Sequence, residues 1–354
     1  MKTAYTFDDI QIIPKYSEVQ SRSECSLVTR FTKNRNIVTP YVSSPMDTVT
    51  GYEMASFMMK YGGVGILHRF MTIEEQAQEV SRIKLDRINH GMVYSQPEAI
   101  VCAAIGATGD YQERAKELAL AGSTVILIDV AHGNTKQVKD AIQWCKQNLP
   151  DYVDIIAGNV ATSEGARNLA EWGADAIRVG IGNGSLCETR IRTGIGVPQV
   201  TALLECVKGV EESGIDVPVM ADGGMKTPGE IAKALSVGAD TVMVGSLLSG
   251  TRESPGEIQK VGMWPNEQLF KKYRGSASAE TKKAHGMEEK NVEGNTKLIP
   301  YKGKASRILD DLSDGLRSSM SYVNATDLVS FRANSEHVII TQNGLIEAKP
   351  HLLL

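Results

Sequence analysis

The sequence has few of the features that mark secreted, membrane or nucleic-acid-binding proteins. Its 354 residues include five cysteines, an odd number at scattered spacings, which favours a reducing cytoplasmic setting over a disulfide framework or a zinc site. No apolar run approaches the roughly 18–20 residues that cross a bilayer, and the first residues do not resemble a signal peptide. The formal net charge of -4 argues against a nucleic-acid partner held by bulk charge. We therefore expect a globular protein that binds neither membrane nor nucleic acid.

A helix–glycine–strand unit recurs along the chain and indicates a parallel α/β fold. It occurs at 118–129, 169–180 and 235–245, each time with a glycine suited to the left-handed end of a helix. Further apolar runs, separated by amphipathic segments, bring the expected strands to eight: 37–44, 63–68, 100–105, 124–130, 154–160, 176–180, 217–221 and 241–244. Eight such units in about 250 residues predict a TIM (β/α)8 barrel. A doubly wound open sheet is the alternative, although a nucleotide fingerprint at the first βα turn is missing.

The regular alternation ends after Gly250. Residues 251–304 are polar, rich in lysine and glutamate, and have no clean period. We therefore expect a mobile lid without regular structure, within a single barrel domain that spans 1–354. Helical periodicity resumes at Ser306, and a short edge strand is expected near 336–342.

The loop after the sixth expected strand holds the best candidate nucleophile. Three alternating glycines are followed there by Cys187, with Thr189 and Arg190 close behind. Glycine lets the backbone approach a ligand, and an arginine near a thiol favours the thiolate. A loop cysteine without a role is the alternative interpretation. Three other cysteines lie in strand-like or helical runs and are predicted to be buried, namely Cys102, Cys145 and Cys206.

Glycine-rich turns at two strand ends predict a phosphate site. The seventh expected strand leads into Asp222-Gly-Gly224 and the eighth into Gly245-Ser246, where backbone amides and a helix N-terminus can meet an anion. Ordinary turn glycines are the alternative. Asp222 is placed to accept ribose hydroxyls or to cap the following helix. Asp129, at the end of the fourth strand, faces the same rim and suits a second ribose or a cofactor amide.

Taken together, these motifs resemble the IMP dehydrogenase/GMP reductase family over nearly the whole chain. The resemblance rests on residues 5–10, 43–48, 182–190, 221–224, 244–247 and 315–322. It implies a TIM barrel, a homotetramer, a purine mononucleotide substrate (GMP or IMP) and Cys187 as the nucleophile toward purine C2. The implied substrate-binding residues are Ser44, Met46, Ser185, Asp222, Gly223, Gly224, Gly245, Ser246, Tyr273, Gly275 and Ser276. The implied cofactor-binding residues are Asp129, Val130, Ala131 and Gly180, and the carbonyls of Gly182, Gly184 and Cys187 would hold a monovalent cation, potassium.

Two activities occur in this family, and the lid separates them. Typical dehydrogenases insert a CBS domain pair after the second strand, for which this chain has no room. Their lid also carries an Arg-Tyr pair that activates water, and residues 275–304 contain no such dipeptide. Segments 275–280 and 289–294 instead resemble a bacterial GMP reductase lid, with Glu280 one position late.

The resemblance thus implies reductive deamination of GMP to IMP with NADPH, or with NADH. Thr189 and Glu280 would relay a proton to the departing ammonia, with Glu288 and Glu289 as other lid carboxylates. IMP dehydrogenase, which converts IMP, NAD and water to XMP, is the alternative. An FMN-dependent barrel and a nucleotide-binding regulator with an inactive site are more distant ones.

Overall fold

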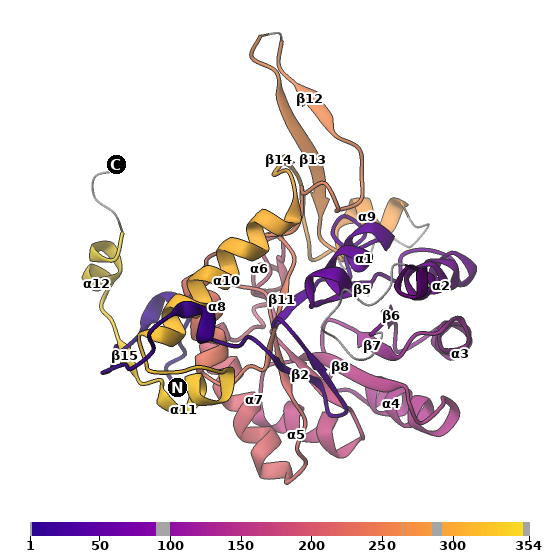
Figure 1. Cartoon of the computed structure of the whole chain (residues 1–354). Helices are drawn as coiled ribbons and strands as arrows, with labels where there is room; N and C mark the ends of the chain where they lie inside the picture. Colours follow the sequence, from indigo (N-terminus) through magenta and orange to yellow (C-terminus); the bar gives the residue numbers. More distant parts are fainter. Residues whose placement is uncertain (1, 90–99, 264, 285–291, 350–354) are drawn as a thin grey trace.

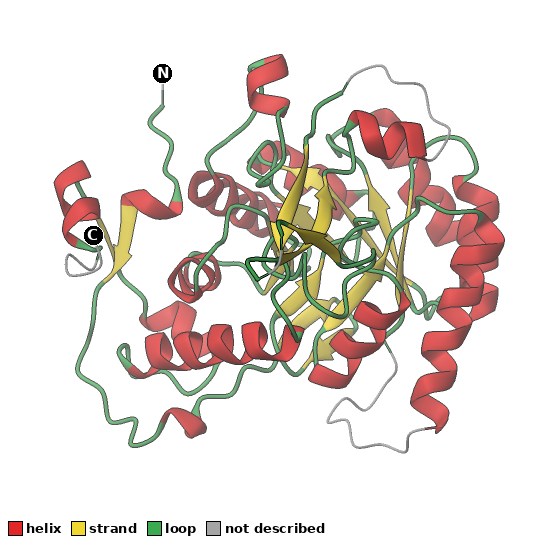
Figure 2. Cartoon of the chain, turned by 90° about the horizontal axis from the view of Figure 1, so that it is seen from above, coloured by secondary structure: helices red, strands yellow, loops and turns green. Residues whose placement is uncertain are grey.

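The computed structural model describes residues 2–89, 100–263, 265–284 and 292–349. At its centre, short apolar segments form a closed barrel of parallel strands in the order β4–β5–β6–β7–β8–β9–β10–β11. The strands lie at the centre of the molecule, with helices around them (Figure 2). The predicted TIM barrel is therefore confirmed, and the open doubly wound sheet is excluded.

The eight barrel strands are buried almost throughout. Among their residues, all are buried except Asp129 and Asp222, which end their strands and are partly exposed. Both carboxylates therefore emerge at the carboxyl ends of the strands, where barrel enzymes place their sites. The strands are β4 (Tyr41–Ser43), β5 (Val64–Leu67), β6 (Cys102–Ile105), β7 (Val125–Asp129), β8 (Asp154–Val160), β9 (Ala176–Val179), β10 (Val219–Asp222) and β11 (Thr241–Val244).

Amphipathic helices connect these strands, as the sequence predicts. The glycines that follow α3 and α8 (Gly122 and Gly238) have φ of 109° and 122°, which fits the expected left-handed helix ends. Between β5 and β6 the chain has α2 and residues 90–99, which lie outside the described ranges. The helices are α1 (Tyr52–Tyr61), α2 (Ile73–Asn89), α3 (Tyr111–Ala121), α4 (Lys136–Asn148), α5 (Ser163–Glu171), α6 (Thr189–Thr193), α7 (Gln199–Ser213) and α8 (Pro228–Ser236).

The first expected strand, 37–44, is wrong in its extent. Ile37 belongs to an antiparallel hairpin of β2 (Thr29–Thr32) and β3 (Arg35–Ile37), and the barrel strand begins only at Tyr41. Pro40 separates the two, because a proline has no N–H to donate to a continuous ladder. Arg35 of the hairpin forms an ion pair with Asp154, the first residue of β8. The hairpin therefore closes the amino-terminal end of the barrel, opposite the emerging carboxylates.

The prediction that 251–304 lacks regular structure is also wrong. This stretch contains β12 (Gln259–Val261), β13 (Gln268–Arg274), α9 (Ala279–Ala284) and β14 (Thr296–Pro300). The three strands form an antiparallel sheet that projects from the barrel (Figure 1). Most of their side chains are exposed on both faces, so these strands show no apolar alternation. We call β12–β14 the projecting sheet.

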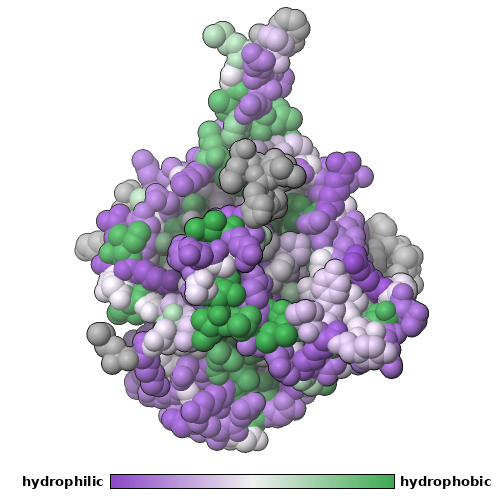
Figure 3. All heavy atoms as spheres, turned by 90° about the vertical axis from the view of Figure 1, so that its left-hand side faces the viewer, coloured by the Kyte–Doolittle hydropathy of each residue, from purple (hydrophilic) through white to green (hydrophobic). Residues whose placement is uncertain are grey.

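The ends of the described chain pack together beside the barrel. β1 (Ile10–Ile12) pairs antiparallel with β15 (His337–Ile339), which confirms the expected edge strand. The remaining elements are η1 (Phe7–Asp9), η2 (Arg22–Glu24), α10 (Ala305–Ser321), α11 (Leu328–Asn334) and α12 (Gln342–Glu347). On this side of the molecule apolar side chains reach the surface among polar ones (Figure 3). Within the described ranges, no helix combines the length and apolarity required to cross a membrane.

Candidate active site

The site is a cavity of about 370 Å³ at the carboxyl ends of the barrel strands. A smaller cavity of about 90 Å³ shares Ser44, Asp222 and Tyr273 with it. The larger cavity is lined by fifteen residues expected from the sequence: Ser44, Met46, Asp129, Val130, Ala131, Gly180, Gly182, Gly184, Ser185, Cys187, Thr189, Asp222, Tyr273, Gly275 and Ser276. The smaller adds Gly223, Gly224, Gly245 and Ser246. Among the described residues, the fold thus brings together all the candidate substrate, cofactor and cation residues with Cys187 and Thr189, but not Glu280.

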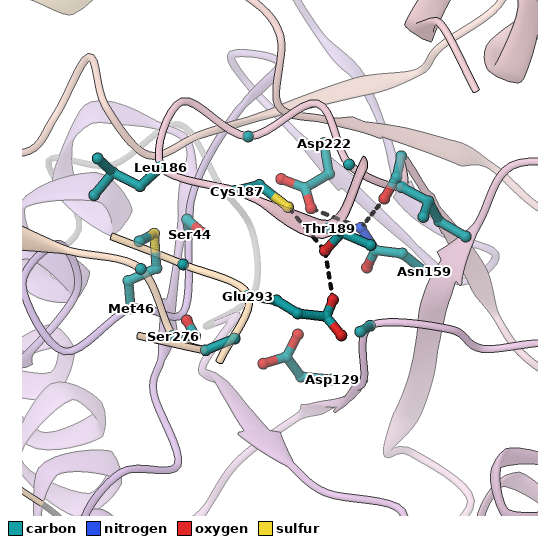
Figure 4. Close-up of a pocket in the computed structure, with 18 of the residues that line it drawn as sticks. Ser44, Met46, Asp129, Asn159, Leu186, Cys187, Thr189, Asp222, Ser276 and Glu293 are labelled. Carbon is teal, nitrogen blue, oxygen red and sulfur yellow. Dashed lines mark hydrogen bonds between the residues drawn. The ribbon is translucent and has the colours of Figure 1, made fainter. Parts of the chain in front are cut away.

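Three side chains that line the larger cavity form a hydrogen-bonded chain (Figure 4). The Cys187 thiol donates to Oγ1 of Thr189 at 3.1 Å, and that hydroxyl donates to Oε2 of Glu293 at 2.7 Å. Cys187 is partly exposed, whereas the other four cysteines are buried. A thiol, a hydroxyl and a carboxylate in this order can move a proton between a nucleophile, a leaving group and a base.

Glu280 does not reach this chain. It lies in the first turn of α9, its side chain is 52% exposed, and it forms an ion pair with Lys272 at 3.2 Å. The carboxylate at Thr189 is instead that of Glu293, which sequence reasoning missed although it lies within the 289–294 motif. Glu288 and Glu289 lie outside the described residues.

Backbone pairing explains why Glu293 lies beside Thr189. Gly294 faces Cys187 in an antiparallel bridge, flanked by hydrogen bonds from Glu188 N to Glu293 O at 2.8 Å and from Asn295 N to Leu186 O at 3.1 Å. On its other side the same segment meets the 275–278 turn, where Gly294 bridges Ser278. Segment 293–295 is therefore held between the cysteine loop and the rest of the lid.

Glycine is required in the cysteine loop because Arg190 fills the space beside it. A Cβ on Gly182, whose φ is 79°, would lie 2.6 Å from Cγ of Arg190. The Arg190 guanidinium donates to the carbonyls of Val197 at 2.6 Å and Ile181 at 3.4 Å. Arg190 thus braces the loop. The Cys187 amide donates to the Gly184 carbonyl at 3.0 Å, which closes the turn.

A buried arginine connects the two strand-end carboxylates. Arg178 of β9, with its side chain 8% exposed, forms ion pairs with Asp129 and with Oδ2 of Asp222, the latter at 2.9 Å. Asn159 also donates to Oδ2 of Asp222, at 2.7 Å. Burial alone lowers the pKa of Arg178, but Asp222 and Asp129 outweigh it and raise the pKa above its ordinary value. Sequence reasoning missed Arg178 and Asn159, because both lie inside short buried strands.

The smaller cavity is lined by groups that suit an anion. It is lined by Lys226 and lies next to the start of α8, whose first turn is capped by Thr227. The Tyr273 hydroxyl lies 3.2 Å from Oγ of Ser185, and burial raises the pKa of this tyrosine. Its phenol therefore remains protonated and able to donate a hydrogen bond.

Comparison with known proteins gives consistent matches over the whole chain. The model of the IMP dehydrogenase / GMP reductase domain matches residues 4–351. Inosine-5'-monophosphate dehydrogenase of Cryptosporidium parvum is 38% identical, with 98% of this chain and 94% of that protein covered. The enzyme of the same name from Nitrosopumilus maritimus is 32% identical, with 100% and 99% covered. Among solved structures, a cysteine-to-alanine variant of Trypanosoma brucei GMP reductase in complex with guanosine 5'-monophosphate is 29% identical, with a TM-score of 0.88 and 99% and 98% covered.

Proposed function

The chain belongs to the IMP dehydrogenase/GMP reductase family, and within that family we propose that it is a GMP reductase, converting GMP to IMP and ammonia with NADPH. The observation that carries this proposal is the chain from Cys187 through Thr189 to Glu293. Loss of ammonia needs a proton donor close to the nucleophile, which this chain supplies. Activation of water needs a dedicated base, and the lid sequence lacks the Arg-Tyr pair that performs this in the dehydrogenases. GMP is also the ligand in the structurally similar T. brucei enzyme.

The residues act in the following order. The Cys187 thiolate adds to C2 of GMP while Thr189 and Glu293 pass a proton to the 2-amino group, which leaves as ammonia. C2 remains bonded to sulfur. NADPH, when bound, would supply a hydride to this carbon, and the C–S bond would then break to release IMP and the Cys187 thiolate. Asp222 would hold the ribose. The phosphate would lie in the smaller cavity, whose lining includes Ser44, Ser185, Gly224, Ser246 and Tyr273.

Cofactor and cation sites follow from the same cavity. Asp129, Val130, Ala131 and Gly180 border it and would face the nicotinamide half of the cofactor. A neighbouring cavity of about 450 Å³ shares Arg69 and Phe70 with it, which extends the room for a dinucleotide and adds a cation for its phosphates. Neutral carbonyl oxygens suit a hard monovalent cation such as potassium, and those of Gly182, Gly184 and Cys187 would hold it. Its role would be to fix the cysteine loop.

IMP dehydrogenase is the second candidate. The relatives at 32% and 38% identity, which are named IMP dehydrogenases, support it. Cys187 and the same nucleotide site would then act on IMP. The alternative requires a water-activating group elsewhere in the lid.

Absorbance at the reduced-nicotinamide wavelength tests the proposal. Purified protein with potassium receives GMP and NADPH in one cuvette, and IMP and NAD in another. The proposal expects absorbance to fall in the first and to remain constant in the second. A rise in the second alone would establish the dehydrogenase instead. Replacing NADPH by NADH in the first cuvette measures the cofactor preference.

The remaining proposals concern the state of the whole protein. We propose a single catalytic domain with a mobile lid and a homotetramer in the cytoplasm. Apolar side chains on the face beside α10, α11 and β15 support self-association (Figure 3). Val329 of α11 is 80% exposed. Light scattering after gel filtration should give four times the 38.4 kDa chain mass, and a monomer would contradict the assembly.

A further inference from the structure

A side-chain contact joins the lid segment to the cysteine loop right beside the catalytic groups. Nδ2 of Asn295 donates to Oε1 of Glu188 at 2.6 Å. Glu188 stands between Cys187 and Thr189, and Asn295 follows Glu293 by two residues. We propose that Asn295 is a positioning residue that, through Glu188, holds the Glu293 carboxylate on Thr189. The inference rests on the proposed function.

The backbone pairing by itself is short. One bridge, Cys187 with Gly294, and two flanking hydrogen bonds connect the loop to the segment. In such a ladder a slip of one residue would turn Glu293 to the other face and remove its carboxylate from Thr189. A side-chain bond that only one register can form prevents this slip, and the Asn295–Glu188 contact is such a bond.

Glu188 is itself held in place before Asn295 meets it. Arg192, one helical turn further along α6, donates to Oε2 of Glu188 from Nε at 3.0 Å and pairs with it from Nη2 at 2.9 Å. The Glu188 side chain is 20% exposed. Its other oxygen, Oε1, therefore has a defined position for the Asn295 amide. Arg192, Glu188 and Asn295 together form what we call the clamp, which connects the cysteine loop to the lid segment.

The Asn295→Asp variant tests the clamp. Aspartate has the shape of asparagine, but it cannot donate a hydrogen bond when ionised and places a negative charge against Glu188. We expect kcat for GMP reduction to fall about tenfold while the KM for GMP stays within about twofold. Glu188→Gln keeps an oxygen acceptor for the amide and should retain activity within about threefold. Asn148→Asp is the matched control, because Asn148 donates to the Trp144 carbonyl at 2.9 Å on the surface of α4, and it should leave kcat unchanged.

Repeating the Asn295→Asp substitution in a Glu293→Gln variant distinguishes an effect on the position of Glu293 from a general loss of structure. In Glu293→Gln the carboxylate that Asn295 positions is absent, so adding Asn295→Asp should lower kcat by less than about twofold. An equal loss in both backgrounds would show that Asn295 acts independently of Glu293, and the inference would be wrong. Full activity of Asn295→Asp alone would also overturn it.

A separate measurement tests the clamp if the proposed function itself is wrong. If the wild-type protein turns over neither GMP nor IMP, the function fails, and the clamp is then measured by the rate of Cys187 alkylation with iodoacetamide. Loosening of segment 293–295 should raise that rate about threefold in Asn295→Asp, because this segment pairs with the cysteine backbone. An unchanged rate would refute the clamp whatever the reaction.

Discussion

The roles of single residues at the site depend on which lid carboxylate reaches Thr189. Glu293 lies 2.7 Å from the Thr189 hydroxyl, whereas Glu280 pairs with Lys272 on the surface. Glu293→Gln should therefore lower kcat about 100-fold or more, because the proton relay loses its base. Glu280→Gln is the matched control and should stay within about threefold of wild type, since an exposed ion pair contributes little. Steady-state kinetics of both variants show which carboxylate acts in the relay. A larger loss of kcat in Glu280→Gln than in Glu293→Gln would assign the relay to Glu280.

The five thiols should differ sharply in reactivity. Burial raises the pKa of Cys145 to about 12 and also raises the pKa values of Cys102 and Cys206. These thiols stay protonated and inert at mildly alkaline pH, well below those pKa values, whereas Cys187 is partly exposed. One equivalent of iodoacetamide should therefore label Cys187 selectively, as read by peptide mass spectrometry. Labelling of a peptide that contains Cys102 in the folded protein would contradict this expectation.

At the scale of elements, three strand ends are joined by one guanidinium. Arg178 of β9 holds Asp129 of β7 and Asp222 of β10. Arg178→Met would leave two carboxylates facing each other without a cation. We expect a loss of about 3–5 kcal/mol in the free energy of unfolding and higher KM values for both nucleotide and cofactor. Thermal unfolding with kinetics measures both, and normal KM values for both ligands would argue against the bridge.

Helix packing depends on one glycine between α5 and α7. A Cβ on Gly209 would lie 2.1 Å from the carbonyl oxygen of Ser163, so the helices must separate to accept it. Gly209→Ala should destabilise the protein by about 1–3 kcal/mol in denaturant unfolding. Gly229→Ala in α8 is the control, because its nearest neighbour would be 3.9 Å away and alanine favours a helix. Equal stability of the two variants would mean that the helices accommodate the methyl group.

The sequence predicts the barrel strands better than it predicts the projecting sheet. The barrel strands are short, buried apolar runs set between amphipathic helices, so their order and the fold could be predicted. The projecting sheet could not, because β12–β14 expose most residues on both faces and carry no alternation. Pro40 is the signal in the sequence that the first barrel strand begins only after it, at Tyr41.

The residues themselves predict the candidate site where it stands at or just after a strand end, whereas Tyr273, Gly275 and Ser276 of the lid are implied only by the family resemblance. Cys187, Asp222 and Gly224 have local signals in glycine-rich turns. Arg178 is a single cation inside an apolar strand, and its pairing with Asp129 has no signature in the sequence. The Glu293 contact depends on how a distant segment folds back over the barrel.

At the scale of the whole molecule, the catalytic groups come from two remote parts of the chain. Thr189 and Glu293 are 104 residues apart. Six of the eight barrel strands, β4 to β9, precede Thr189, and the last two, β10 and β11, lie between Thr189 and Glu293. Neighbouring βα units close short loops, whereas this contact must close a long one at a larger entropic cost. During refolding from denaturant, the barrel should therefore regain its circular dichroism before enzymatic activity returns. Simultaneous recovery of the two signals would mean that the lid segment docks as early as the strands pair.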